Sequence, residues 1–302
     1  MKIRFSRKRF RCQLHARASA LANRYCWPEI GYYYFGEFGY LNLEVLGGLE
    51  LLFKQHPQRR LRIATYANYA KLLEHMFPGR VACYAPSWQF ASERRSQHRY
   101  HSAWLHWSLF WRGFTVPLQS LLDGLPNRGE INTARLFYLS EPLNESADSR
   151  PTKDAKRYIS VFPRGRRGYF ARKNLSVAAW VEILAMLATI APFPVVLHGI
   201  ADEMVNLPAA ERMIRPRDVV EQIRYLRQSH FCISPDSGFV QFALNCACDV
   251  IVIGGTIQYH EFAAFNPFGA RLCITCQNGT EYLPALRHFA VESCGELLKQ
   301  AS

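Results

Sequence analysis

Short apolar runs alternate with amphipathic runs along the chain, and glycine-rich or polar turns separate them. Residues 30–35 are β-branched and aromatic, which predicts a strand, and a glycine turn leads from them into the helical apolar spacing of 41–54. Strands at 61–65 and 81–84, with a helix at 67–76 between them, continue the alternation. The order strand–helix–strand–helix–strand predicts the start of a doubly wound α/β domain.

A second alternating region follows a polar stretch at 143–154, which has almost no apolar residues and is typical of a linker. Strands predicted at 158–162 and 193–198 alternate there with helices at 176–190 and 217–228. In the first of these helices Ser176 is the predicted N-cap, and the apolar face comprises Val177, Trp180, Val181, Leu184, Leu187 and Ala188.

The two regions together predict an α/β protein of two Rossmann-like doubly wound domains that face each other across a cleft. We expect these domains at 29–145 and 155–302, after a basic segment at 1–28, with a terminal helix near 292–299. Residues 87–112 are dense in Trp, His and Arg. They either line the cleft for a polar acceptor or cover the sheet as a helix-and-loop layer, and we favour the layer.

One βαβ unit in the second region has the strongest local signals. An apolar strand at 230–233 leads through Ser234-Pro235 into the polar turn Asp236-Ser237-Gly238, and a buried helix at 239–246 and a buried strand at 250–253 follow. The polar turn stands at the carboxyl end of a strand, where open α/β sheets bind ligands. A helix start also offers free N–H groups to an anion.

The formal net charge of +13 favours an anionic partner. Eight Lys and Arg residues and no acidic residue occur in the first 24 positions. This segment is either a solvated tail or an attachment to an anionic membrane surface. It lacks the long apolar run of a secretory signal, and no apolar stretch is long enough to span a membrane. We therefore expect a cytoplasmic protein, which could be peripheral on the inner membrane face.

Several well-known sites are absent from the sequence. It contains no P-loop, no G-x-G-x-x-G, no H-E-x-x-H and no G-x-S-x-G motif. The nine cysteines, an odd number, are typical of reduced, buried thiols in a cytosolic protein. Cys273 and Cys276 could bind zinc together with Cys246 and Cys248, but we favour structural thiols because these cysteines lie in apolar runs.

The remaining candidates are loops that suit phosphate groups. Arg164 and Arg166 lie on a glycine loop directly after the strand at 158–162, and an arginine can bind phosphate through two parallel hydrogen bonds. Ser237, with the N–H groups of the helix start that includes Gly238, forms a second anion cradle. Asp236 either shapes this loop or caps the helix. The alternative for the arginines is a solvated loop.

Glu37, on the first glycine turn of the other domain, is the candidate general base for an acceptor hydroxyl. Its alternative role is a charge at a helix N-terminus, which the helix dipole favours. Glu44, further along the same predicted helix, is the second candidate base.

A family resemblance accompanies these residues. The second region resembles the C-terminal domain of GT-B glycosyltransferases, and most of all the heptosyltransferase-type family that builds the lipopolysaccharide core. The match rests on these stretches: 159–164, 172–176 with Trp180, 195–199, 236–238 and 250–254. It adds Lys173, His198 and Gln241 to the residues expected at the donor phosphates. Gln241 stands where the family usually has His, Gly254-Gly255 replaces Phe-Gly, and Gly36-Glu37 is the nearest equivalent of a Gly-Asp loop with a catalytic Asp.

The resemblance implies transfer of a sugar from a nucleotide-sugar donor to a hydroxyl of a cell-surface glycan or lipid-linked acceptor, with no cofactor and no obligatory metal. Positive groups and helix N–H donors would stabilise the leaving diphosphate. Two alternatives stay open. One is a CMP-Kdo-type or pyruvyl transferase, and the other is a non-enzymatic basic protein that binds RNA or an anionic glycan. For the transferase we expect no specific nucleic-acid partner.

Overall fold

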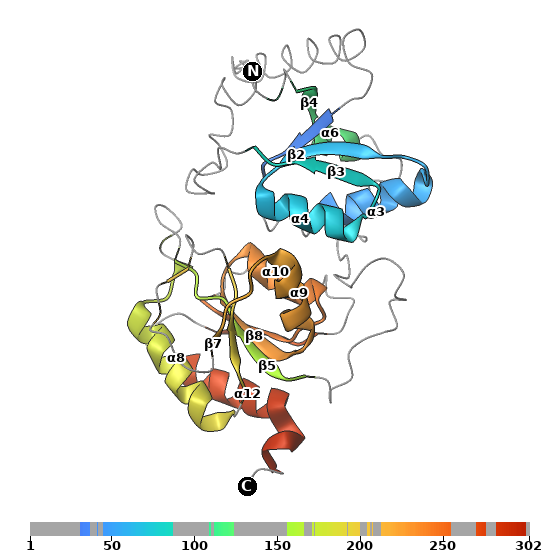
Figure 1. The fold of residues 1–302 in the computed structure, drawn as a ribbon. Helices are drawn as coiled ribbons and strands as arrows, with labels where there is room; N and C mark the ends of the chain where they lie inside the picture. The colour runs from blue at the N-terminus through green and yellow to red at the C-terminus, as the bar shows by residue number, and fades with distance from the viewer. Residues whose placement is uncertain are drawn as a thin grey trace, which may run out of the picture.

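A computed structural model of the chain describes residues 31–36, 41, 45–86, 109, 112–123, 156–165, 171, 173–191, 193–199, 204–205, 207, 213–254, 270–275 and 282–299. These residues form two parallel β-sheets with their helices, one built from each half of the chain (Figure 1). The predicted basic segment at 1–28 and the predicted linker at 143–154 lie outside the described residues. The domain boundaries and the cleft stay predictions.

The first sheet has the strand order β3-β2-β1-β4. Its elements are β1 (Gly31–Tyr34), α3 (Leu46–Gln55), β2 (Leu61–Thr65), α4 (Ala67–Met76), β3 (Val81–Tyr84), β4 (Phe114–Pro117) and α6 (Leu118–Asp123). The predictions of β2, α4 and β3 are confirmed residue for residue. The sequence did not indicate β4 and α6, because the mixed aromatic and basic composition around them has no clear period.

The second sheet has the strand order β10-β9-β8-β5-β6-β7. Its strands are β5 (Tyr158–Val161), β6 (Val195–Leu197), β7 (Met213–Ile214), β8 (Ser229–Pro235), β9 (Val250–Ile253) and β10 (Leu272–Thr275). Its helices are α8 (Val177–Ile190), α9 (Val219–Arg227), α10 (Gly238–Asn245) and α12 (Tyr282–Lys299). Counted in chain order, the strands follow the Rossmann arrangement, and the order reverses between β5 and β8.

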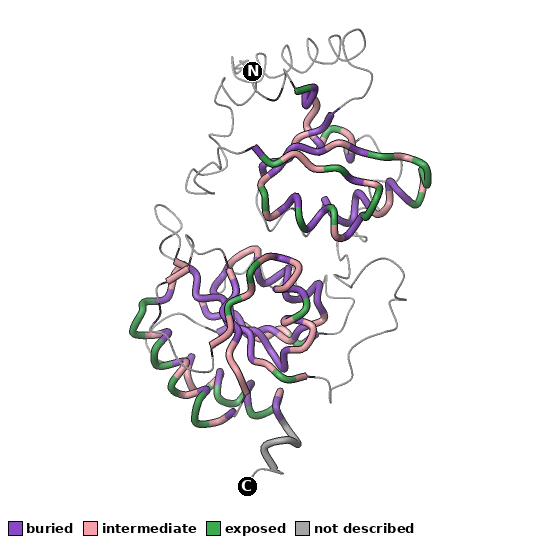
Figure 2. The backbone as a smooth tube through the Cα atoms, in the orientation of Figure 1, coloured by how far each residue is buried: buried purple, intermediate pink, exposed green. Residues whose placement is uncertain are grey.

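The second sheet is buried where the order reverses. Every residue of β8 and of β9 is buried, as parallel strands covered on both faces require (Figure 2). Helix α8 begins as predicted, since Ser176 accepts a hydrogen bond from the backbone N–H of Ala179. The prediction of the buried apolar face of α8 was partly wrong.

The buried side of α8 comprises Trp180, Ile183 and Leu187, whereas Val177 and Val181 are 49% and 42% exposed. The helix is apolar on nearly every side, so its sequence is compatible with more than one buried stripe. Packing against α12 and the sheet selects the stripe that contains Ile183. Among the described helices, none combines the length and the apolar character that crossing a membrane requires.

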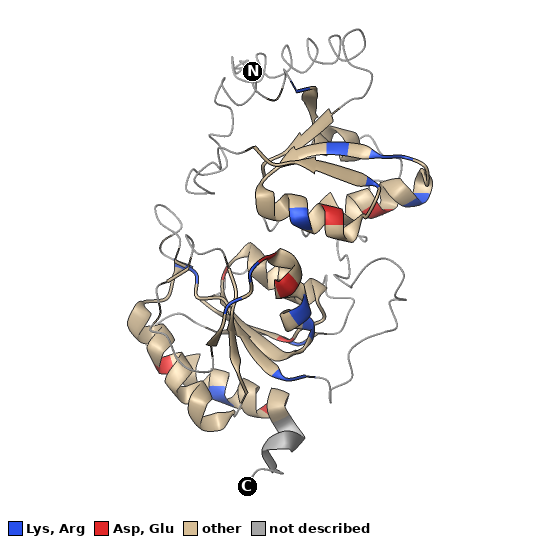
Figure 3. Cartoon of the chain, viewed as in Figure 1, with Lys and Arg blue, Asp and Glu red and all other residues tan. Residues whose placement is uncertain are grey.

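The two halves meet through α4 and α9. These helices pack against each other, and one cluster of buried apolar side chains includes residues of both halves, among them Leu73 of α4 and Ile223 of α9. Both helices carry acidic and basic residues (Figure 3).

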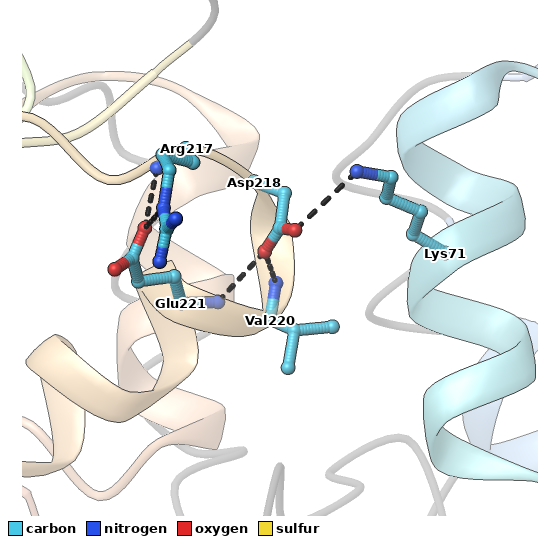
Figure 4. A network of polar contacts seen from close by, with 5 residues as sticks. All are labelled: Lys71, Arg217, Asp218, Val220 and Glu221. Carbon is cyan, nitrogen blue, oxygen red and sulfur yellow. Dashed lines mark hydrogen bonds and ion pairs between the residues drawn. The ribbon is translucent and has the colours of Figure 1, made fainter.

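An ion pair joins Lys71 Nζ to Asp218 Oδ2 at 3.3 Å (Figure 4). Asp218 also caps α9, because its carboxylate accepts hydrogen bonds from the N–H groups of Val220 and Glu221. These bonds, with that of Glu221 first, hold the pKa of Asp218 below its ordinary value. Asp218 therefore stabilises α9 and also contacts the first half of the chain.

Candidate functional site

The candidate site lies at the carboxyl ends of β5 and β8, where the strand order reverses. The two strands pair in parallel, with Val161 opposite Ile233, and the N–H of Phe162 donates to the carbonyl of Ile233 at 2.9 Å. The segments that follow the two strands therefore leave the same edge of the sheet side by side. This is the position where open α/β sheets bind ligands.

The start of α10 forms one side of this edge. Ser237 is the N-cap in an extended conformation, and its hydroxyl accepts a hydrogen bond from the N–H of Phe239 at 3.3 Å. Gly238 is the first helical residue, and its small size leaves the backbone at the helix start accessible to a ligand. The positive end of the helix dipole thus faces the edge. Ser237, and not Asp236, caps the helix, so Asp236 takes another role.

Asp236 forms an ion pair with Lys173. The distance from Lys173 Nζ to Asp236 Oδ2 is 2.7 Å, and the side chains are 25% and 6% exposed. Lys173 comes from the turn before α8, far from Asp236 in the sequence. The carboxylate fixes the ammonium group at the edge, and an ammonium group has three protons to donate. The structure therefore brings together two residues that the sequence predicted only separately.

Arg164 lies in the loop after β5 and is 4% exposed, so its surroundings are not those of a solvated loop. Its Nη1 donates to Asn174 Oδ1 at 2.8 Å, and its backbone forms an antiparallel bridge with Met204. Asn174 directly follows Lys173, so one turn orients both basic side chains. Asn174 lies within the matched stretch 172–176, but its contact with Arg164 was not predicted, because it depends on tertiary packing.

His198 takes a different position from the one expected. It is fully buried, and its Nε2 lies 2.7 Å from Ser160 Oγ, which in turn lies 2.7 Å from Ser229 Oγ. Burial lowers the pKa of His198 to about 3, against a smaller opposing effect of a hydrogen bond with Gln222. The ring is neutral near pH 7, which argues against a charged contact with a donor phosphate.

Gln241 also lies inside the fold. It is 4% exposed, and its Nε2 donates to Asn245 Oδ1 at 2.8 Å, one turn further along α10. Its amide therefore stabilises the helix. Glu37 and Arg166 lie outside the described residues, as does Glu44.

The first sheet has its own point of reversal, between β1 and β4. After β1, the described segment continues to Gly36, the residue directly before Glu37 in the sequence. Hydroxyl groups from the end of β2 and the start of α4 contact this segment, and they were not among the predicted site residues. The spacing Thr65-Tyr66-x-x-Tyr69 at a strand end is the only signal that could have suggested them.

No family model and no curated protein matches the sequence. Among solved structures, E. coli ADP-heptose LPS heptosyltransferase II superposes with a TM-score of 0.50 at 14% identity, over 90% of this chain and 99% of that chain. The protein has the GT-B fold. The fold implied by the resemblance is thus confirmed, over both halves.

Two further solved structures are similar to this chain. E. coli heptosyltransferase WaaC with ADP has a TM-score of 0.49 at 14% identity, over 87% of this chain and 99% of that chain. The glycosyl transferase family 9 protein from Veillonella parvula has a TM-score of 0.48 at 11% identity, over 90% of this chain and 97% of that chain.

Proposed function

We propose that the protein is a nucleotide-sugar-dependent glycosyltransferase that moves a sugar to a hydroxyl of a cell-surface glycan or lipid-linked acceptor. The observation that supports this most is the ion pair of Lys173 with Asp236, beside the capped start of α10, at the point where the strand order reverses. Rossmann-type sheets bind nucleotides at this point. The GT-B fold supports the same reaction class by analogy.

In this proposal the second half binds the donor. Lys173, Arg164 and the N–H groups at the start of α10 face the diphosphate, with Arg166 as a further candidate on the same loop. As the acceptor oxygen bonds to the anomeric carbon, the bond from that carbon to the phosphate oxygen breaks. The leaving diphosphate gains negative charge, which the positive groups stabilise without a metal ion. The acceptor proton passes to a base, for which we propose Glu37.

The nucleotide is the first part of the proposal to test. ADP-heptose is the sugar nucleotide named for the E. coli heptosyltransferase II, so ADP leads a thermal-shift panel that also contains GDP, UDP and CMP. A nucleotide present at a hundred times its Kd stabilises the folded state by about 2.7 kcal/mol. We expect stabilisation by one diphosphate.

Other results of this panel point to other functions. Stabilisation by CMP alone selects a CMP-Kdo-type transferase. No shift with any nucleotide, together with RNA binding that weakens steeply with salt, contradicts the glycosyltransferase and supports a nucleic-acid-binding protein.

We further propose that the first half receives the acceptor and that the basic segment at 1–28 brings the protein to an anionic membrane surface on the cytoplasmic side. Each basic residue near such a surface contributes about 1 kcal/mol. Co-sedimentation with vesicles of anionic and of neutral lipids tests this part. Equal binding to both, or binding to neither, contradicts it.

A further inference from the structure

The chain leaves β1 through three consecutive residues whose carbonyl groups all accept hydrogen bonds from hydroxyl side chains. Thr65 Oγ1 donates to the carbonyl of Tyr34 at 2.6 Å. The hydroxyl of Tyr66 donates to the carbonyl of Phe35 at 3.5 Å, and that of Tyr69 to the carbonyl of Gly36 at 3.3 Å. We call the three donors, Thr65, Tyr66 and Tyr69, the hydroxyl clamp.

Ring packing fixes the clamp. Tyr66 packs edge-on against Phe35, with ring centroids 5.2 Å apart, and edge-on against Tyr69, at 5.1 Å. The Tyr69 ring lies 6.3 Å from that of Tyr34, and Tyr69 is 2% exposed. Thr65 is fully buried and lies opposite Tyr34 in the parallel register. Each hydroxyl is therefore held by a side chain that has little freedom to move.

The backbone from Tyr34 to Gly36 has little room to take another path. A Cβ atom added at Gly36 would lie 2.6 Å from the Tyr34 ring, so the backbone passes directly over that ring. Buried carbonyl groups need hydrogen-bond partners, and satisfying them is the simplest role of the clamp. The three donors, which come from the end of β2 and the start of α4, also fix the direction of three peptide units.

That direction matters because of where the turn lies. Gly36 ends the described segment at the carboxyl edge of the first sheet, beside the point where its strand order reverses. The next residue in the sequence is Glu37. We propose that Thr65, Tyr66 and Tyr69 are positioning residues, which fix the path of the backbone as it leaves β1 directly before Glu37, the proposed base. The inference rests on the proposed function, since its effect on rate requires Glu37 to act as the base.

Helix α4 connects the hydroxyl clamp to the second half of the chain. Tyr69 and Lys71 lie on the same helix, and Lys71 forms the ion pair with Asp218 of α9. The helix also packs against α9 through apolar side chains. The helix that holds the end of β1 is thus also the helix that contacts the second half of the chain.

Removal of the tyrosine hydroxyls tests the inference. The double variant Tyr66→Phe/Tyr69→Phe keeps both rings and removes both donors. We expect kcat for sugar transfer to fall about tenfold or more, because small misplacements of a catalytic group have large effects on rate. The donor KM and the nucleotide Kd should stay within about twofold, since the donor half is unchanged.

Two further variants separate positioning from stability. Thr65→Val should lower kcat in the same way, and Thr65→Ser, which keeps the hydroxyl, should restore it. Tyr84→Phe is the matched control, because Tyr84 lies at the end of the neighbouring strand β3 and contacts Phe114 and Arg112 through its ring. A double variant with unchanged kcat, or one in which nucleotide affinity falls as much as kcat, overturns the inference.

Hydrogen–deuterium exchange gives a readout that does not depend on activity. In the double variant, a peptide covering the end of β1 should exchange about tenfold faster, and a peptide covering β8 and Asp236 should exchange at the wild-type rate. If the wild-type protein binds no nucleotide and transfers no sugar, the proposed function fails. In that case hydrogen–deuterium exchange alone tests the clamp. Equal exchange rates of wild type and double variant at the end of β1 would overturn it.

Discussion

The carboxyl edges of the two sheets have the same topology and different side chains. Each edge contains a point where the strand order reverses. The described residues of the second edge bring together the charged side chains of Lys173, Asp236 and Arg164. Those of the first edge bring together aromatic rings and hydroxyl groups around the end of β1. The fold provides two equivalent ligand positions, and the side chains determine what each can do.

This difference suggests that the two edges have different functions. A charged edge beside a helix N-terminus suits a diphosphate, whose charge increases as the glycosidic bond breaks. An edge whose described residues are mainly rings and hydroxyl groups holds its backbone rigidly, which suits the orientation of a base and an acceptor.

The largest expected effect belongs to the first edge. Glu37→Gln should lower kcat by about 10²- to 10⁴-fold, the usual contribution of a general base, with little change in nucleotide affinity. Steady-state kinetics with a transferable donor measures this. Glu44→Gln is the control, and retained turnover in Glu37→Gln together with loss in Glu44→Gln would assign the base to Glu44.

At the second edge, Lys173→Ala should weaken nucleotide binding by about 10- to 100-fold. The variant removes a charge-assisted hydrogen bond to phosphate, worth about 1.5–3 kcal/mol, and leaves the Asp236 carboxylate without this partner. Calorimetric titration measures the affinity. Lys71→Ala removes a lysine of another ion pair and should leave the affinity unchanged. Equal affinities of wild type and Lys173→Ala contradict the donor assignment.

Beneath the charged edge, His198 should make stability depend on pH. Its folded-state pKa is about 3, below the ordinary value of 6.5, so the unfolded chain binds the proton more readily. The stabilisation by the neutral ring is fully present above pH 6.5 and is lost as the pH falls from there towards 3. The expected slope is about 1.4 kcal/mol per pH unit.

Urea unfolding at pH 7, 6 and 5 measures this slope. In His198→Gln the part of the slope due to His198 should disappear, although the variant is less stable at every pH. Identical slopes for wild type and variant would show that the folded state does not lower the pKa of His198.

The smallest effect is expected where the two halves meet. Lys71 and Asp218 have side chains that are 56% and 31% exposed, so Lys71→Ala should cost at most about 1 kcal/mol of unfolding free energy. Asp218→Ala should cost more, about 0.5–2 kcal/mol, because it removes the cap of α9. Asp218→Asn keeps the cap and should resemble Lys71→Ala. A loss in Lys71→Ala well above 1 kcal/mol would show that the ion pair contributes substantially to the contact between the halves.

Much of the fold could be predicted from local patterns. The strands β2, β3 and β9 and the helix α4 have clear periods and clear turn signals, and their predicted bounds match the structure. Strand β7 spans two residues, too few for a period, and β10 follows a stretch with weak signals. The ambiguous face of α8 shows the same limit, because only tertiary packing selects among several apolar stripes.

The candidate site was predictable only in part. Asp236, Ser237 and Lys173 were named from a polar turn and from a family resemblance, and the structure joins them. The Arg164–Asn174 contact and the hydroxyl clamp depend on which segments the fold places side by side, and no spacing within one segment reveals that. His198 was expected at the donor phosphates from the family resemblance, whereas the structure buries it against Ser160.

A crystal structure of the protein with ADP tests the central claim most directly. The account predicts that the diphosphate lies at the carboxyl ends of β5 and β8, with an oxygen about 2.8 Å from Lys173 Nζ and the phosphates against the start of α10. A nucleotide bound at the aromatic edge of the first sheet, or bound away from both edges, would contradict it.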